Sequence, residues 1–170
     1  MAEKPKSREA LSKREFAAWG GFLYTYKTTI AVLDAELERE LGLSLSSYEV
    51  LLRLNSEPGR RMRMSELAEA VLLTRSGMTR LVDRLERDGL VERVPCPSDG
   101  RGLHCSLTNR GAELFERAQP IHLAGVRERF LSPLKKGQQR ALADAWDALR
   151  GEGDELPPCA ADDAVADSGD

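Results

Sequence analysis

The sequence predicts a mainly α-helical protein with one β-hairpin, and three observations support this fold class. Apolar residues recur every three or four positions over most of the 170-residue chain, as they do in amphipathic helices. Ser, Thr and Gly stand at the ends of these segments, where they cap helices well. The helical spacing stops once, where residues 91–94 and 103–107 alternate around a loop rich in Gly, Pro and Asp. We therefore expect about six helices and a two- to three-stranded β-sheet.

A long first helix is expected over residues 13–41. Ser12 and Glu15 form a capping-box pattern at its start, and Gly42 suits the left-handed residue that ends many helices. The apolar residues step by three or four and form one stripe along the helix, namely Phe16, Trp19, Leu23, Tyr26, Ile30, Leu33, Leu37 and Leu41. A chain of this size has little of its own to cover so long a stripe.

Two short helices follow the first. One is expected to start with a capping box of Ser46 and Glu49 and to end near Ser56, before a Pro-Gly turn. The other is expected over residues 65–71, with Ser65 as its N-cap.

The fourth helix begins after Thr74, an N-cap candidate, and ends at Gly89. Leu90 can close back on Leu85, as in a Schellman cap. One face of this helix is apolar at helical spacing and consists of Met78, Leu81, Val82 and Leu85. Beyond the hairpin, Thr108 is expected to cap a long helix that Pro120 kinks without ending it. A last helix carries Leu142, Ala145, Trp146 and Leu149.

The charge is unevenly distributed. Residues 151–170 contain seven acidic and no basic side chains, so the other 150 residues carry 25 basic and 21 acidic ones, a net charge of +4. We expect this acidic tail to be disordered and residues 1–12 to be flexible. Residues 60–111 alone hold ten arginines and seven acids. An anionic partner is therefore compatible with the total charge of −3.

A short helix, a tight turn, a second helix and a hairpin form the order of a winged helix-turn-helix, whose second helix enters the DNA major groove. Arg can bind guanine with two hydrogen bonds and Ser or Thr can reach either base type, while Gly77 lets the backbone approach closely. Arg84 is placed for a phosphate, and Arg101 at the hairpin tip suits a narrow minor groove. The candidate DNA-binding residues are Ser65, Thr74, Arg75, Ser76, Gly77, Thr79, Arg80, Arg84 and Arg101.

Four motifs resemble the MarR family of winged-helix transcriptional regulators over roughly residues 13–150. They are Ser65-Glu66-Leu67-Ala68-Glu69, the run 76–93, Asp99-Gly100-Arg101, and Leu107-Thr108-Asn109-Arg110-Gly111. The resemblance implies an obligate two-fold homodimer with a helical dimerisation domain (residues 13–41 and 108–150) and a DNA-binding domain (residues 42–107). It also implies a pseudo-palindromic operator and a wing held by Asp99 through an arginine.

The same resemblance implies a repressor that a small aromatic or anionic ligand releases from DNA. Trp19 and Tyr48 are candidate ligand-binding residues, although core packing is the ordinary role of such side chains.

Other functions have weaker support. No ordering of Ser, His and Asp, no Gly-rich phosphate loop and no carboxylate pair suggests an enzyme or a cofactor. Cys96, His104 and Cys105 are too few ligands for a metal, and the last two point to opposite faces of a strand. The polar N-terminus and the lack of a long apolar run favour a cytoplasmic location without a membrane span. Two alternatives stay open: a winged-helix protein-interaction module, and a thiol redox sensor that uses Cys96 or Cys105.

Overall fold

The computed structural model describes the backbone of residues 10–96 and 99–150, and within these ranges it describes all side chains except those of residues 96 and 99–102. The predicted acidic tail and most of the predicted flexible N-terminus lie outside the described residues. No helix in the described part is long and apolar enough to cross a bilayer.

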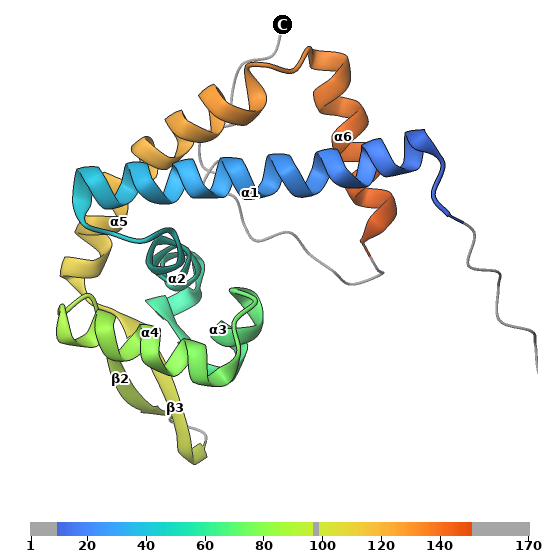
Figure 1. The fold of residues 1–170 in the computed structure, drawn as a ribbon. Helices are drawn as coiled ribbons and strands as arrows, with labels where there is room; N and C mark the ends of the chain where they lie inside the picture. The colour runs from blue at the N-terminus through green and yellow to red at the C-terminus, as the bar shows by residue number, and fades with distance from the viewer. Residues whose placement is uncertain (1–9, 97–98, 151–170) are drawn as a thin grey trace, which may run out of the picture.

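The described chain consists of helices and one small antiparallel sheet (Figure 1). The helices are α1 (Lys13–Leu41), α2 (Leu45–Ser56), α3 (Met64–Ala70), α4 (Arg75–Arg87), α5 (Asn109–Val126) and α6 (Lys136–Leu149). The strands are β1 (Arg61–Arg63), β2 (Val91–Cys96) and β3 (Asp99–Leu107), in the sheet order β1-β3-β2. A 3-10 turn, η1 (Pro58–Arg60), precedes β1, and a π-helical turn, η2 (Arg127–Leu131), follows α5. The predicted fold class, mainly α-helical with about six helices and a two- to three-stranded wing, is confirmed.

Hydroxyl caps start three of the helices, as predicted. Ser12 and Glu15 form a reciprocal capping box, in which the Ser12 N–H donates to Glu15 Oε2 at 2.7 Å. Thr74 Oγ1 accepts the N–H of the third residue of α4 at 3.1 Å, and Thr108 Oγ1 does the same for α5 at 3.0 Å. Gly42 ends α1 with a φ of 64°, in the left-handed region. These residues explain why α1, α4 and α5 start, and why α1 ends, where the sequence predicts.

The predicted start of α2 was wrong. Ser44, not Ser46, is its N-cap and accepts the Ser47 N–H at 3.3 Å. The first helical N–H, from Leu45, donates to Asp34 of α1 at 2.8 Å. Both Ser44 and Ser46 could cap a helix here, and the hydrogen bond from Leu45 to Asp34 of α1 favours the start at Ser44.

The predicted start of α3 was also wrong. Arg63 is the N-cap residue, and its N–H donates to Glu66 Oε2 at 3.3 Å, whereas Ser65 lies inside the helix. The reason is that the residues before α3 form β1, which pairs with residues 104–106 of β3. This three-residue strand is too short to show alternation in the sequence.

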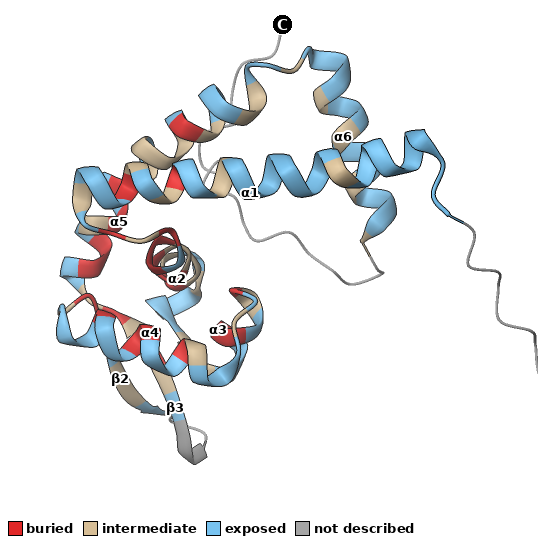
Figure 2. Ribbon diagram, viewed as in Figure 1, coloured by how far each residue is buried: buried red, intermediate tan, exposed pale blue. Residues whose placement is uncertain are grey.

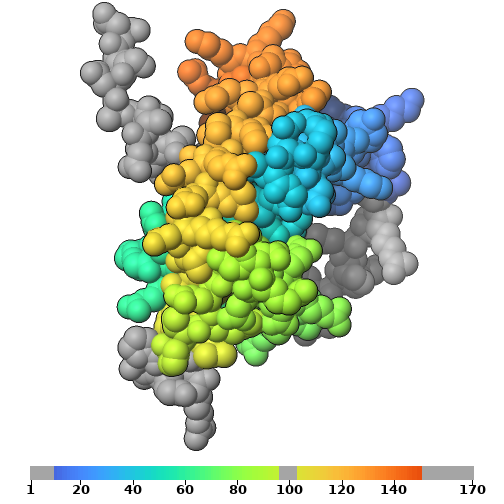
Figure 3. Space-filling view, turned by 90° about the vertical axis from the view of Figure 1, so that its left-hand side faces the viewer, coloured from blue at the N-terminus to red at the C-terminus, as the bar shows by residue number. Residues whose placement is uncertain are grey.

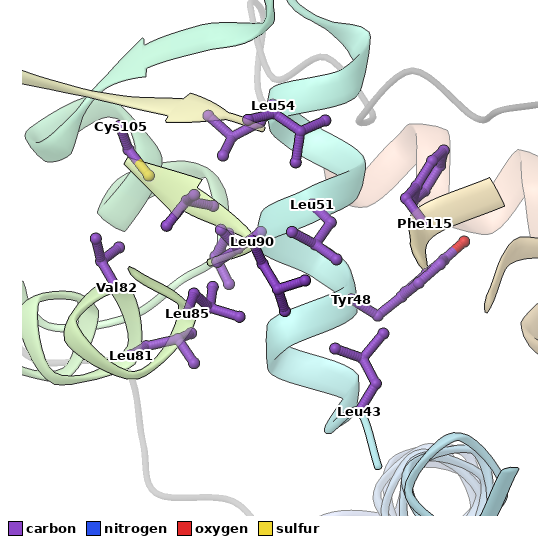
Figure 4. Close-up of a cluster of buried hydrophobic side chains, with 14 of the residues drawn as sticks. Leu43, Tyr48, Leu51, Leu54, Leu81, Val82, Leu85, Leu90, Cys105 and Phe115 are labelled. Atoms are coloured by element: carbon purple, nitrogen blue, oxygen red, sulfur yellow. The ribbon is translucent and has the colours of Figure 1, made fainter. Parts of the chain in front are cut away.

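The core is built around α2, which lies between α1 and α4 (Figure 1). Leu51 and Leu54 of α2 are fully buried and meet the apolar face of α4, represented by Val82 and Leu85, as the close-up in Figure 4 shows. Buried Cys105 of β3 closes this core from the side of the sheet. The core therefore fixes α4 by its apolar face and turns the opposite face outward.

A close approach of α5 to α1 completes the fold. A Cβ at Gly125 would lie 2.6 Å from both Leu33 Cδ2 and Glu36 Oε2. Arg129, just beyond α5, donates to Glu36 Oε1 at 2.9 Å. The α5 helix runs through Pro120 without ending, as predicted.

Candidate nucleic-acid interface

The outer face of α4 carries most of the predicted DNA-binding residues. Met78, Leu81, Val82 and Leu85 are buried beneath the helix. In Figure 3 the side chains of α4 and of the residues that follow it, in green, lie on the surface in the lower part of the molecule. Among the predicted residues on this helix, those with exposed side chains are Arg75, Ser76, Thr79, Arg80 and Arg84. Helical spacing alone thus identifies the exposed face of α4.

The arginines of this region differ in their partners. Within the part of the chain that the structure describes, Arg75 and Arg80 form no ion pair. Arg93 of β2, in contrast, pairs with Asp83 at 2.6 Å and with Glu86. These bonds hold β2 against α4 and neutralise two acids on the helix. The charges of Arg75 and Arg80 are left for an external anion.

The hydroxyl groups near the start of α4 have intramolecular partners. Thr74 Oγ1 accepts the Gly77 N–H and lies 3.3 Å from Ser76 Oγ, and Thr79 Oγ1 donates to the carbonyl of Arg75 at 2.9 Å. A Cβ at Gly77 would lie 3.1 Å from Thr74 Oγ1. Thr74 is thus a helix cap first, and Gly77 leaves space for that cap.

A hollow of about 430 Å³ lies where the starts of α3 and α4 meet β3. It brings together three predicted residues, Ser65, Arg75 and Thr79, although Ser65 is ten positions or more away in sequence. It also contains Leu103, which the sequence did not single out. Strand alternation groups Leu103 with the buried residues Cys105 and Leu107, but its side chain is 48% exposed. The hairpin extends past the core at this point, which alternation alone does not reveal.

The surroundings of Arg84 differ from the expectation of a phosphate ligand. Its Nη2 donates to Ser44 Oγ at 3.2 Å and to Ser47 Oγ at 3.1 Å. Both serines belong to the start of α2, about forty positions away in sequence. The predicted phosphate contact would have to compete with these hydrogen bonds.

The hairpin tip lies partly outside the description. The predicted roles of Arg101 and Asp99 depend on side chains outside the described residues, as does the role of Cys96. Cys105 is described and has no exposed surface, and burial raises the pKa of its thiol to about 12. A neutral, buried thiol reacts slowly, so Cys105 is a poor redox sensor.

The two predicted ligand-binding residues are not brought together. Tyr48 is 2% exposed and packs in the core, with its ring 5.7 Å from Phe115 and 4.6 Å from His122. Trp19, which is 55% exposed, lies instead near the start of α1, on the wall of a groove. Each aromatic residue therefore belongs to a different part of the molecule.

A wide apolar groove lies along α1. It has a volume of about 1070 Å³ and lies between α1 and the segment from η2 to α6. Phe22 of α1 and Trp146 of α6 both line the groove, and their rings are in contact with a centroid distance of 5.6 Å. Figure 2 shows that most of α1 is exposed. The large apolar side chains of α1 that are exposed there are Trp19, Phe22 and Tyr26.

Known proteins share this sequence pattern. Residues 41–102 match the sequence model of the MarR family. An HTH-type transcriptional repressor of Mycobacterium bovis is 35% identical over 113 residues, which span 65% of this chain and 79% of the relative. An uncharacterised HTH-type transcriptional regulator of Bacillus cereus is 32% identical over 111 residues, which span 65% of this chain and 71% of the relative.

Solved structures share the fold. Sco3205, a MarR family transcriptional regulator from Streptomyces coelicolor solved in complex with DNA, matches with a TM-score of 0.80 and 32% identity, over 89% of this chain and 98% of that chain. AbsC, a MarR family transcriptional regulator from the same organism, matches with a TM-score of 0.78 and 33% identity, over 83% of this chain and 95% of that chain.

Proposed function

The chain belongs to the MarR family of transcriptional regulators, and we propose that it binds double-stranded DNA in the cytoplasm as a two-fold homodimer. In this proposal α4 enters the major groove of each half of a pseudo-palindromic operator, and the hairpin reaches the adjacent minor groove. The DNA-contacting residues are Ser65, Arg75, Ser76, Thr79 and Arg80, with Arg101 at the hairpin tip.

The observation that carries this proposal is that Arg75 and Arg80, exposed on the outer face of α4, form no ion pair with any described residue. An arginine without an internal acid keeps its full charge and both hydrogen-bonding edges for guanine or phosphate. Internal ion pairs at Arg75 and Arg80 would have favoured the alternative, a winged-helix protein-interaction module. Thr74 and Gly77 support the interface by forming the start of α4.

The apolar groove on α1 supports the homodimer. Exposed apolar surface of this extent is unusual for a monomer and is typical of a subunit interface. The groove involves both ends of the described chain, α1 and α6, which agrees with the division into a dimerisation domain (13–41 and 108–150) and a DNA-binding domain (42–107). Two copies related by a two-fold axis would present two α4 helices to one DNA face.

We propose repression as the sign of regulation, because the Mycobacterium bovis relative is named a repressor. Release by a small aromatic or anionic ligand is part of the same proposal. Trp19, on the wall of the groove, is a candidate ligand contact, while buried Tyr48 would need a rearrangement of the core to meet a ligand.

The test begins with selection of bound duplexes from a random DNA pool, which gives the operator and its symmetry. Arg75→Gln and Arg80→Gln are then compared with the wild type by fluorescence anisotropy at several salt concentrations. Each substitution is expected to cost ~1–3 kcal/mol of binding free energy if the arginine reads a base. Arg140→Gln on α6, an exposed arginine far from α4, is the control and should bind normally. Normal operator binding by both α4 variants would contradict the proposal.

A further inference from the structure

Arg84 belongs to α4, but its side chain is joined to the start of α2. One guanidinium nitrogen, Nη2, donates to the hydroxyl oxygens of Ser44 and Ser47 at 3.2 and 3.1 Å. The two hydroxyl oxygens are themselves 2.8 Å apart. A single arginine nitrogen thus closes a small hydrogen-bonded triangle between two helices.

Ser47 is the buried member of this triangle, and its burial restricts where Arg84 can lie. Ser47 is the buried polar residue of the described chain, with 3% of its surface exposed. A buried hydroxyl needs a partner, and a charged donor makes a stronger hydrogen bond than a neutral one. Ser47 therefore favours one position of Arg84, and with it one position of α4.

The start of α2 is also joined to α1. Asp34 Oδ1 accepts the Leu45 N–H at 2.8 Å, and a carboxylate at a helix N-terminus is stabilised by the helix dipole. Because α2 lies between α1 and α4 (Figure 1), its N-terminus binds α1 through Asp34 and α4 through Arg84. The dimerisation helix and the DNA-facing helix are thus connected through one short segment.

Resting on the proposed function, we propose that Arg84 is a positioning residue that sets the orientation of α4 relative to α1, and not a phosphate ligand. In a two-fold dimer the two α4 helices must lie about one DNA turn, ~34 Å, apart. A change in the angle of α4 on α2 changes this separation. Arg84 and Ser47 would therefore determine which half-site spacing the dimer accepts.

The first experiment replaces Ser47, which carries no charge and is buried away from the DNA-facing surface. Ser47→Ala is expected to weaken operator binding roughly three- to tenfold without changing the salt dependence. The penalty for inserting one base pair between the half-sites should also become smaller. Ser46→Ala, an exposed neighbour on the same helix, is the matched control and should behave as the wild type.

The second experiment replaces the arginine. Arg84→Gln should match Ser47→Ala in affinity loss and keep the wild-type salt slope, and the double variant should be no weaker than either single variant. Arg84→Lys keeps the charge but not the planar donor group, so it should show the same loss. If circular dichroism shows that Ser47→Ala does not fold, the Arg84→Lys variant still tests the proposal.

The proposal is overturned if Arg84→Gln lowers the salt slope by about 1, Arg84→Lys restores binding, and Ser47→Ala binds as its control does. That pattern would identify a phosphate contact. If selection from the random pool recovers no duplex that the wild type binds, the proposed function itself fails. Wild-type binding combined with a silent Ser47→Ala would instead reject only the positioning role.

Discussion

His122 lies on α5 with its imidazole against the ring of Tyr48 of α2, so it joins helices from both parts of the molecule. Its Nδ1 is buried and has no hydrogen-bond partner among the described residues. Burial lowers the pKa of the imidazole from its ordinary value near 6.5. The folded chain therefore holds this side chain neutral, packed as an aromatic ring.

This burial predicts a pH-dependent stability. Well above pH 6.5 the imidazole is neutral in both the folded and the unfolded chain. As the pH falls from about 7.5 to about 5.5, the unfolded chain takes up the proton first, so the free energy of unfolding should decrease. His122→Phe keeps the ring but cannot be protonated, and urea unfolding should show a shallower pH dependence. Burial also raises the pKa of Glu49, but this residue is present in both proteins, so its contribution cancels when the two pH dependences are compared.

An unchanged pH slope in His122→Phe would assign the dependence to other groups. The variant should remain folded at neutral pH, because a Phe ring can stack on Tyr48 as the imidazole does.

At the scale of elements, the chain just after α4 packs closely against the start of α5. The Leu90 carbonyl accepts hydrogen bonds from the Thr108 N–H at 3.1 Å and from Thr108 Oγ1 at 3.0 Å. In the first turn of α5, a Cβ at Gly111 would lie 2.1 Å from the same carbonyl oxygen. Helix α5 can dock here only because residue 111 has no side chain.

Gly111→Ala is therefore expected to destabilise the protein by roughly 2–3 kcal/mol, because backbone atoms cannot move aside as flexible side chains do. Gly137→Ala, in the first turn of α6, is the matched control. A Cβ there meets nothing within 4 Å, so it should be neutral or should stabilise by up to about 1 kcal/mol. Urea unfolding measures both, and equal effects of the two substitutions would contradict this account.

The elements show what the sequence could predict and what it could not. The caps Ser12, Thr74 and Thr108 were predictable because each hydroxyl bonds an N–H three residues away, which is a local matter. The starts of α2 and α3 depend on Asp34 and on pairing with β3, which are distant in sequence. The outer face of α4 follows from its period, whereas the bond from Arg84 to Ser47 crosses 37 positions. No local pattern reports such a contact.

At the scale of the whole molecule, the exposed apolar face of α1 separates the ordered core from the proposed partner. Only Leu33 and Leu37 of α1 are buried within the described chain, and α6 has no buried residue. The helices that would form the dimer are thus the ones with the least support from their own subunit. Their stability depends on what covers the groove.

A charge in the groove should separate the subunits. Phe22→Glu is expected to weaken self-association by about 30-fold, the equivalent of ~2 kcal/mol for a central aromatic residue. Tyr24→Glu is the matched control, because Tyr24 lies on the same helix, is 73% exposed and does not line the groove. Sedimentation at several concentrations measures both variants. A dimer of unchanged strength in Phe22→Glu would remove the groove from the interface.

If the groove is covered only in a dimer, the amount of active regulator depends steeply on how much protein a cell makes. If operator binding requires two copies, the active species forms in proportion to the square of the chain concentration when dimers are scarce. Halving the amount of protein in a cell would then lower the active form about fourfold. The aromatic side chains of α1 would thereby make the response to changing expression steeper than that of a regulator that acts alone.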